Sequence, residues 1–174
     1  MNGSKRLFFG LTLSDAARRA VARAASAVQF DRGRLHPPEN YHITLVFLGM
    51  TPAEAAPRLL RLGEAAMRKP FELVLAPEMG TFKDGTILWA GVEPSEPLFA
   101  LQGRLAAMLR ENGFPADDAP YRPHITLGRG MRLTAPPPPL EPTAFSVGAV
   151  TLLDSLRRDG RLVYRPLNEP RKGD

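Results

Sequence analysis

Two identical tetrapeptides, His-Ile-Thr-Leu, begin at His42 and His124 and hold two of the three histidines in this chain of 174 residues. Both lie in runs of β-branched and apolar residues that are typical of β-strands. Because side chains alternate between the two faces of a strand, the His and the Thr of each copy share one face. The sequence therefore predicts two strands that each present one imidazole and one hydroxyl.

This pair of strands has the groups that cleavage of a phosphodiester by water requires. The reaction needs a base for the nucleophile and an acid for the departing oxygen, on opposite sides of phosphorus, and imidazole serves in either role near neutral pH. The hydroxyls of Thr44 and Thr126 could hold the non-bridging oxygens, and an arginine could neutralise the developing charge. A strained cyclic phosphate would be a natural substrate.

Other roles for histidine fit the sequence less well. A lone histidine in an apolar strand is usually structural, but two copies of one tetrapeptide reverse that expectation. The chain has no cysteine, no His-x-His pair and no carboxylate cluster beside either motif, so we expect no metal and no cofactor. His36 precedes Pro37 and Pro38, which predicts a surface loop and, as the lesser alternative, a place beside the cleft.

Composition indicates a folded, basic protein. The chain is 44% hydrophobic and 24% charged, with a formal net charge of +5, which suits a polyanionic partner such as RNA or a phosphorylated metabolite. No apolar stretch approaches the length of a membrane span, and the short apolar run after Lys5 and Arg6 reads as a strand, not as a signal peptide. We expect a cytoplasmic monomer.

The elements that carry the two tetrapeptides follow an α+β pattern. Helices are expected over residues 14–29, from a capping box at Thr51-Pro52-Ala53-Glu54, and from Pro97 to Gly113. Pro57 would kink the second helix or delay its start. The expected strands cover residues 5–13, 41–48, 71–76, 86–92, 123–127, 144–153 and 161–164, with the last two joined as a hairpin. Two similar halves, each with one tetrapeptide, indicate internal pseudo-symmetry.

The segments Tyr41–Gly49 and Arg122–Arg129 resemble the paired His-x-Thr-x motifs of the 2H phosphoesterases. The likeness is strongest to the RNA 2′,3′-cyclic phosphodiesterases of the ThpR/LigT group, first described as 2′-5′ RNA ligases. The opening Arg6–Gly10 strand, Asn40 and the closing hairpin through Tyr164 also resemble that group. The resemblance implies a single domain over residues 1–174, made of two interleaved lobes. Two antiparallel sheets would face a central groove, with the helices outside.

The resemblance also implies roles for individual residues. His42 matches the proton donor and His124 the proton acceptor that activates water, in a reaction that opens an RNA-terminal or nucleoside 2′,3′-cyclic phosphate to a 2′-phosphomonoester. Thr44 and Thr126 match phosphate-holding positions. Arg129 matches a further phosphate-binding position, but strict alternation puts it on the face of Ile125, so it could reach the phosphate only if the strand ended or bulged at Gly128.

Tyr41, Tyr121 and Phe47 could stack on a base, and Arg122 could contact the RNA, although for Phe47 the parity favours packing in the core. The sequence restricts the identity of the substrate less than it restricts the type of reaction. Another cyclic nucleotide or a 2′-5′ nucleotide would suit the same groups. A non-catalytic module that grips RNA or nucleotides through its histidines is the alternative from another functional class. Reversal of the hydrolysis, a 2′-5′ RNA ligation, is chemically allowed.

Overall fold

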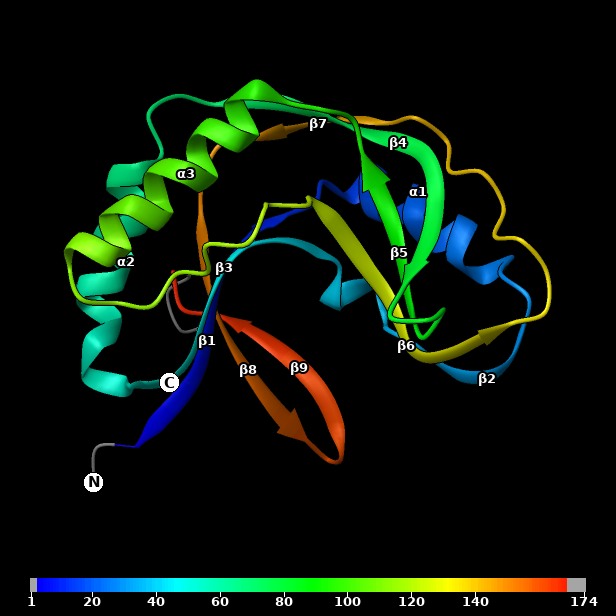
Figure 1. Ribbon diagram of the computed structural model, residues 1–174, viewed down its shortest axis with the longest axis horizontal. Helices are drawn as coiled ribbons and strands as arrows, with labels where there is room; N and C mark the ends of the chain where they lie inside the picture. The colour runs from blue at the N-terminus through cyan, green and yellow to red at the C-terminus, as the bar shows by residue number, and fades with distance from the viewer. Residues whose placement is uncertain (1–2, 169–174) are drawn as a thin grey trace.

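The computed structural model describes residues 3–168, which form three α-helices and nine β-strands (Figure 1). The helices are α1 (Asp15–Ser26), α2 (Ala56–Ala66) and α3 (Glu96–Glu111), and single 3-10 turns cover Pro38–Asn40 and Ala53–Ala55. The strands are β1 (Ser4–Thr12), β2 (Phe30–Leu35), β3 (His42–Pro52), β4 (Phe71–Phe82), β5 (Ile87–Val92), β6 (His124–Leu133), β7 (Ala144–Val147), β8 (Thr151–Arg158) and β9 (Arg161–Pro166).

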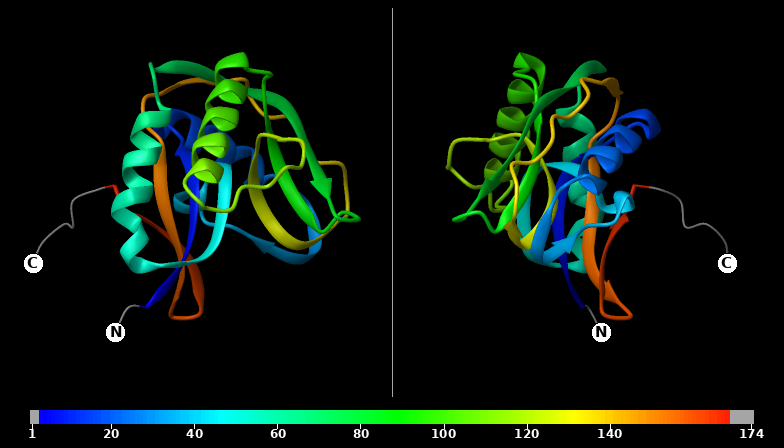
Figure 2. Two further views of the ribbon diagram at one scale, coloured as in Figure 1. Left: turned by 60° about the vertical axis from the view of Figure 1, so that its left-hand side comes forward. Right: turned by 90° about the vertical axis from the view of Figure 1, so that its right-hand side faces the viewer.

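Hydrogen bonding joins the nine strands in one continuous order, β7-β4-β5-β6-β3-β1-β8-β9, with β2 paired to the later part of β6. Only one residue pair joins β6 to β3, so this order divides into two antiparallel sheets, one for each tetrapeptide. The sheets meet where Ile43 of β3 pairs with Ile125 of β6. Both isoleucines are fully buried. The two sheets diverge from this point, as Figures 1 and 2 show, so the predicted bilobal α+β fold is confirmed.

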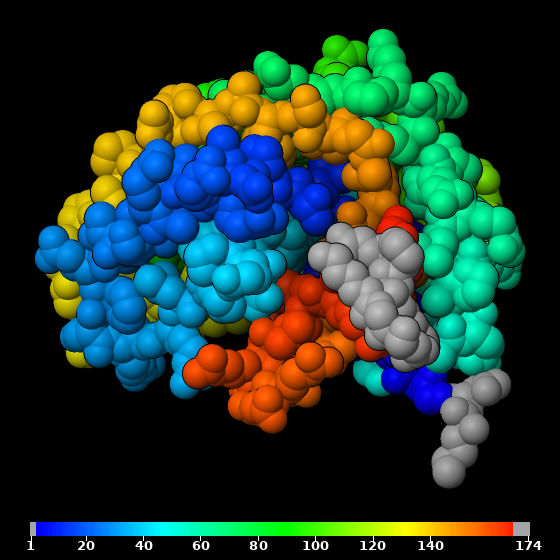
Figure 3. Space-filling model, turned by 180° about the vertical axis from the view of Figure 1, so that it is seen from behind, coloured from blue at the N-terminus to red at the C-terminus, as the bar shows by residue number. Residues whose placement is uncertain are grey.

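The helices pack on the outer sides of the sheets. Helices α2 and α3 contact each other, and they contact β8 and β3 respectively. Helix α1 begins where the Ser14 hydroxyl accepts a hydrogen bond from the Ala17 amide at 3.1 Å, and its small apolar face is buried. From behind, α1 in blue lies beside the yellow-to-orange segment that leads into β7 (Figure 3). Within residues 3–168, no helix covers the opposite faces of β3 and β6.

Two predicted boundaries are wrong for the same reason, which is that strand pairing overrides local sequence signals. The capping box at Thr51 does not start a helix, because β3 continues to Pro52 in register with β1 and buries Thr51, whose hydroxyl donates to the Gly49 carbonyl. Helix α2 starts later, with Pro57 in its first turn, so the expected alternative of a delayed start is the observed one. The segment 30–35, which lies between the expected helix over 14–29 and the expected strand over 41–48, pairs with β6 as strand β2.

The predicted closing strand over residues 144–153 is two strands that belong to different sheets. Strand β7 pairs with β4, and β8 pairs with β1 and β9. The hairpin from β8 to β9 is confirmed, with Asp159 and Gly160 at φ of 51° and 75°, the left-handed conformation that tight two-residue turns require.

Candidate active site

The pairing of Ile43 with Ile125 fixes how the two tetrapeptides face each other. Continuing this antiparallel register by one residue sets His42 across from Thr126 and Thr44 across from His124. Since both isoleucines point into the core, all four polar side chains lie on the other face of the two strands. We call this surface the His–Thr face. Residues far apart in the sequence therefore form one cluster there.

The imidazole of His42 is held at both nitrogens. Its Nδ1 lies 2.7 Å from the Asn40 carbonyl oxygen, which can only accept, so the Nδ1–H donates; its Nε2 lies 3.0 Å from the Thr44 hydroxyl. The rings of Phe8 and Tyr164 each approach to 4.9 Å between centroids. Burial among these groups lowers the pKa of His42 to about 4, an effect that the hydrogen bond with Asn40 partly offsets.

The imidazole of His124 repeats the first contact but has different neighbours. Its Nδ1–H donates to the Arg122 carbonyl at 2.7 Å, and its ring makes a T-shaped contact with Phe82 at 5.0 Å between centroids. Burial lowers the pKa of His124 below its ordinary value, and the positive charge of Arg129 lowers it further. The Nδ1–H bond leaves the Nε2 lone pair to act as an acceptor.

Both strands bulge at the leucine that ends the tetrapeptide. In β3, Thr44 and Val46 pair with consecutive residues of β1, so that Leu45 is the extra residue. In β6, Thr126 and Gly128 pair with consecutive residues of β5, so that Leu127 is the extra residue. Each bulge reverses the alternation, and the burial pattern from the His onward is the same in both strands for six residues.

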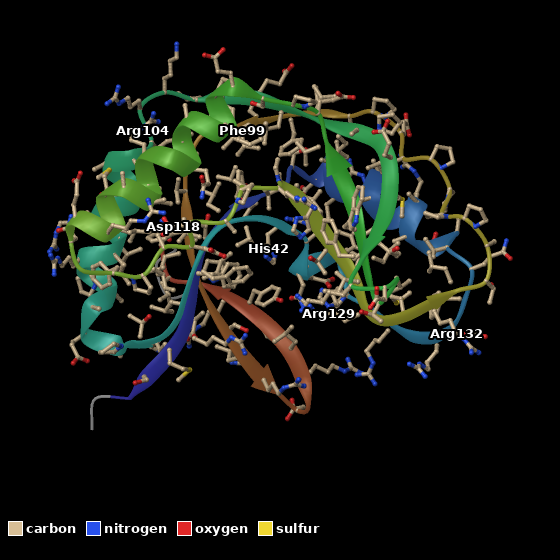
Figure 4. The ribbon with its side chains drawn as sticks, in the orientation of Figure 1. His42, Phe99, Arg104, Asp118, Arg129 and Arg132 are labelled. Atoms are coloured by element: carbon tan, nitrogen blue, oxygen red, sulfur yellow. The ribbon has the colours of Figure 1, made fainter. Side chains whose placement is uncertain are left out.

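These bulges turn the fifth residue after each histidine toward the His–Thr face. In β6 this residue is Arg129, and its charge adds to the burial that lowers the pKa values of His36, His42 and His124. The bulge required for the Arg129 side chain to lie on the same face as His124 is therefore present, at Leu127. In Figure 4, His42 and Arg129 lie together in the central region of the molecule, whereas Arg132 of the same strand lies at its outer edge.

The corresponding residue of β3 is Phe47, which is 66% exposed. The prediction that Phe47 packs in the core is wrong, because the bulge at Leu45 reverses its parity. Its ring approaches that of Phe8 to 6.0 Å between centroids. Strict alternation along the strand cannot predict this change. The condition stated for Arg129, that its strand must end or bulge just before it, applies to the equivalent position in β3 as well.

Glycine at position 128 fits the bulge in β6 closely. A Cβ atom on Gly128 would lie 2.8 Å from the Met131 sulfur and 2.9 Å from the carbonyl oxygen of Arg34. The second of these contacts is with backbone, which a small shift of a side chain cannot relieve. The approach of β2 to β6 thus requires a residue without a side chain just before Arg129.

The residues expected to contact a base occupy three different environments. Tyr41 is 3% exposed and belongs to the hydrophobic core, so its predicted base contact is wrong. Tyr121 is half-buried; its hydroxyl donates to the Thr44 carbonyl at 2.8 Å and its ring packs edge-on against Phe99. Arg122 has an exposed side chain, and its carbonyl holds His124.

Two further residues lie beside the histidines. Asn40 is 6% exposed, and its side-chain amide donates to the Leu162 carbonyl at 2.9 Å, which ties β9 to the segment that holds His42. His36 is half-buried, and its amide donates to the carbonyl of Leu127 at 2.7 Å, directly at the bulge. The charge of His36 also contributes to the lowered pKa of His42. The lesser alternative for His36, a place beside the site, is therefore the observed one.

Residues 3–168 offer neither a metal site nor a membrane-spanning helix. No group of three or more His, Cys, Asp or Glu side chains could hold a metal ion in this part of the chain. Within the same residues, no helix has the length and apolar character needed to cross a membrane.

Comparisons with known proteins agree on one family. A model of the 2′-5′ RNA ligase superfamily matches residues 13–159. The RNA 2′,3′-cyclic phosphodiesterase of Geobacillus stearothermophilus is 34% identical over 83% of this chain and 50% of that protein, so the chain spans about half the length of this relative. The protein of the same name from Escherichia coli (strain K12) is 30% identical over 96% of each chain.

Among solved structures, that of E. coli LigT complexed with 3′-AMP matches with a TM-score of 0.84 and 29% identity, covering 95% of this chain and 96% of LigT. The sequence family and the three-dimensional fold thus agree with each other over most of the chain. Together with the paired tetrapeptides on one face, these matches show that the chain belongs to the 2′-5′ RNA ligase superfamily, as its resemblance to the ThpR/LigT group predicted.

Proposed function

We propose that the protein hydrolyses RNA-terminal and nucleoside 2′,3′-cyclic phosphates to 2′-phosphomonoesters, with two histidines as acid and base. The observation that carries this proposal is the pairing of Ile43 with Ile125, which brings both His-Thr pairs to one face. Support also comes from relatives named RNA 2′,3′-cyclic phosphodiesterase and from the complex of E. coli LigT with 3′-AMP.

His124 is the proposed general base. Its Nδ1–H donates to the Arg122 carbonyl, so its Nε2 can take a proton from water. Its lowered pKa keeps the ring neutral, and therefore able to accept a proton, at neutral pH. The oxygen of this water then forms the new bond to phosphorus.

His42 is the proposed general acid. As the P–O3′ bond breaks, O3′ takes the proton from Nε2 of protonated His42, while O2′ stays on phosphorus and the product is a 2′-phosphate. Burial alone disfavours the protonated ring, because it lowers the pKa of His42 to about 4. An anionic phosphodiester bound beside the ring opposes that effect, so substrate binding itself promotes the acid form.

The phosphate itself would be held by Thr44, Thr126 and Arg129. The threonine hydroxyls can donate to non-bridging oxygens from either side of the Ile43–Ile125 pair, and Arg129 supplies a positive charge on the same face. The scheme assigns no step to a metal or cofactor. If the 5′-hydroxyl of a second RNA replaces water, the same acid and base form a 2′-5′ linkage, although water at its bulk concentration favours hydrolysis.

Product analysis tests the proposal directly. The purified protein should convert 2′,3′-cyclic AMP to 2′-AMP, and an oligonucleotide ending in a cyclic phosphate to its 2′-phosphate, with EDTA present. Formation of 3′-AMP alone, or loss of turnover with the chelator, would contradict the mechanism. Binding without turnover would favour the non-catalytic module, and faster turnover of a 2′-5′ dinucleotide would favour the alternative substrate. The cytoplasmic location and the monomeric state stay predictions.

A further inference from the structure

Two pairs of arginines face each other across strands β2 and β6. Arg34 is the Cα partner of Arg129, and Arg32 is the Cα partner of Arg132. Since Figure 4 shows Arg129 in the central region and Arg132 at the outer edge, we call these the inner pair and the outer pair. All four residues are exposed. Like charges directly opposite each other on neighbouring strands are destabilising, so both pairs carry an electrostatic cost.

The protein compensates the outer pair but not the inner pair. Arg132 donates through two nitrogens to the two carboxylate oxygens of Asp31, which offsets one of the two charges of the outer pair. Within residues 3–168, neither Arg34 nor Arg129 forms a salt bridge with a carboxylate. The inner pair therefore concentrates positive charge at a place where this part of the chain supplies no anion.

The inner pair lies on the His–Thr face, about one nucleotide from the proposed phosphate site. Partners in an antiparallel sheet have side chains on the same face, so Arg34 shares the face of Arg129. Thr126 and Arg129 pair with residues of β5 that are two positions apart, which separates them by about 7 Å along the strands. Neighbouring phosphates of an extended RNA strand are a similar distance apart. The phosphate next to the scissile one therefore falls at the level of the inner pair.

The direction of the proposed reaction carries the RNA chain toward β2. In an in-line displacement the departing O3′ lies on the side of His42, and so does the ribose to which it belongs. Strand β2 lies along the same edge of β6 as β3, and the His36 amide between them donates to the Leu127 carbonyl of β6. O5′ of this ribose leads to the next phosphate of the RNA, which thus lies on the side of Arg34 and away from the attacking water.

We propose, building on the function above, that Arg34 and its partner Arg129 bind the phosphate that precedes the terminal nucleotide of the RNA. A guanidinium pairs with phosphate oxygens through two parallel N–H donors, and an anion between two arginines replaces their repulsion with two attractions. The contact is with the backbone and is therefore independent of the base sequence. This second phosphate site makes the end of an RNA chain a better substrate than a mononucleotide, whose only phosphate is the cyclic one.

Substrates with and without the second phosphate test this assignment. For the dinucleotide ApA ending in a 2′,3′-cyclic phosphate, Arg34→Gln should raise KM by about tenfold, the scale for loss of one hydrogen bond to a charged group. For 2′,3′-cyclic AMP, KM should stay within about twofold, as for a surface substitution away from the ligand. Arg34→Lys keeps the charge and should recover most of the parent KM. Arg32→Gln is the matched control, because Arg32 is an exposed arginine of the same strand in the outer pair, and it should leave both KM values unchanged.

Three outcomes would overturn the second phosphate site. Equal rises in KM for the dinucleotide and the mononucleotide would place Arg34 at the scissile phosphate instead. An unchanged KM for the dinucleotide would show that Arg34 contacts no phosphate. An equal rise in Arg32→Gln would reduce the effect to a general attraction between a basic surface and an anion.

Calorimetry separates this inference from the proposed function, because it needs no turnover. Adenosine 2′,5′-bisphosphate carries the product phosphate and a second phosphate on O5′, whereas 2′-AMP carries the product phosphate alone. Arg34→Gln should weaken binding of the bisphosphate by about tenfold and leave binding of 2′-AMP unchanged. A parent that shows this difference but hydrolyses no cyclic phosphate contradicts the proposed function alone. An active parent without the difference contradicts the second phosphate site alone.

Discussion

The two His-Ile-Thr-Leu strands have the same backbone arrangement around the tetrapeptide but different neighbouring side chains. Both donate Nδ1–H to a carbonyl two residues earlier at 2.7 Å, and both bulge at the leucine. His42 contacts the rings of both Phe8 and Tyr164 and holds its Nε2 near the Thr44 hydroxyl, whereas His124 makes one T-shaped contact, with Phe82. The stronger burial effect is on His42, whose pKa falls to about 4.

This difference suggests that the repeat supplies the scaffold and the neighbours supply the asymmetry. Two strands of identical sequence would otherwise present two equivalent imidazoles. A reaction with distinct acid and base needs them in different environments. The positions that differ include the residues whose carbonyls accept from the imidazoles, Asn40 and Arg122, and the residues that follow the bulges, Phe47 and Arg129.

The largest expected effect separates the acid from the base. His42→Ala and His124→Ala should each lower kcat on 2′,3′-cyclic AMP by at least about a hundredfold, the scale for a positioned acid or base. Catechol cyclic phosphate has a phenolate leaving group, which departs with little help from an acid. On this substrate His42→Ala should recover most of its activity and His124→Ala should not, as measured by initial rates. Recovery in His124→Ala instead would reverse the assignment.

Removal of Arg129 should give the next largest effect and also move the pH profile. Arg129→Gln should lower kcat by roughly a hundredfold if the guanidinium stabilises the phosphate in the transition state. Since its charge lowers the pKa values of both His42 and His124, both limbs of the kcat/KM profile should move to higher pH in the variant. The profile of the parent should have its optimum below about pH 6.5, the ordinary pKa of histidine.

Arg132→Gln provides the control for Arg129, because Arg132 lies on the same strand but forms an exposed ion pair with Asp31. Its profile should coincide with that of the parent. Limbs that stay in place in Arg129→Gln would place Arg129 too far from the imidazoles for the proposed role.

Much of the site followed from the sequence, because alternation along a strand is a local rule. It placed His42 with Thr44 and His124 with Thr126, and the recurrence of the tetrapeptide predicted two matched strands. Alternation failed at Phe47 because a bulge depends on the register with the neighbouring strand, β1, and the residues around Phe47 do not determine that register. Strand β2 and the extension of β3 to Pro52 were not predicted for the same reason, since both form through pairing with strands that are remote in the sequence.

A smaller difference is expected between the two threonines. Thr44→Val removes the partner of His42 Nε2 as well as a phosphate donor, whereas Thr126→Val removes the donor alone. Loss of one hydrogen bond costs about 1.4 kcal/mol, or tenfold. We expect Thr126→Val to raise KM by about tenfold, and Thr44→Val also to lower kcat. Steady-state kinetics over a range of substrate concentrations measure kcat and KM for both variants. If Thr44→Val and Thr126→Val change kcat and KM equally, the Thr44 hydroxyl does not position His42.

The smallest effect concerns Asn40 and Arg122, whose backbone carbonyls accept hydrogen bonds from the two imidazoles, and it is an effect on the free energy of unfolding. Asn40→Ala should lower the free energy of unfolding by about 1–3 kcal/mol, because it leaves the Leu162 carbonyl without its buried donor. Arg122→Ala should change it by less than about 0.5 kcal/mol, since that side chain is exposed. Urea unfolding at neutral pH measures both. Asn40→Asp should resemble Asn40→Ala, because a carboxylate cannot donate to a carbonyl. Equal stabilities in the Asn40 and Arg122 variants would mean that the anchor to β9 does not distinguish the two strands, and would leave the rings around His42 as the source of their asymmetry.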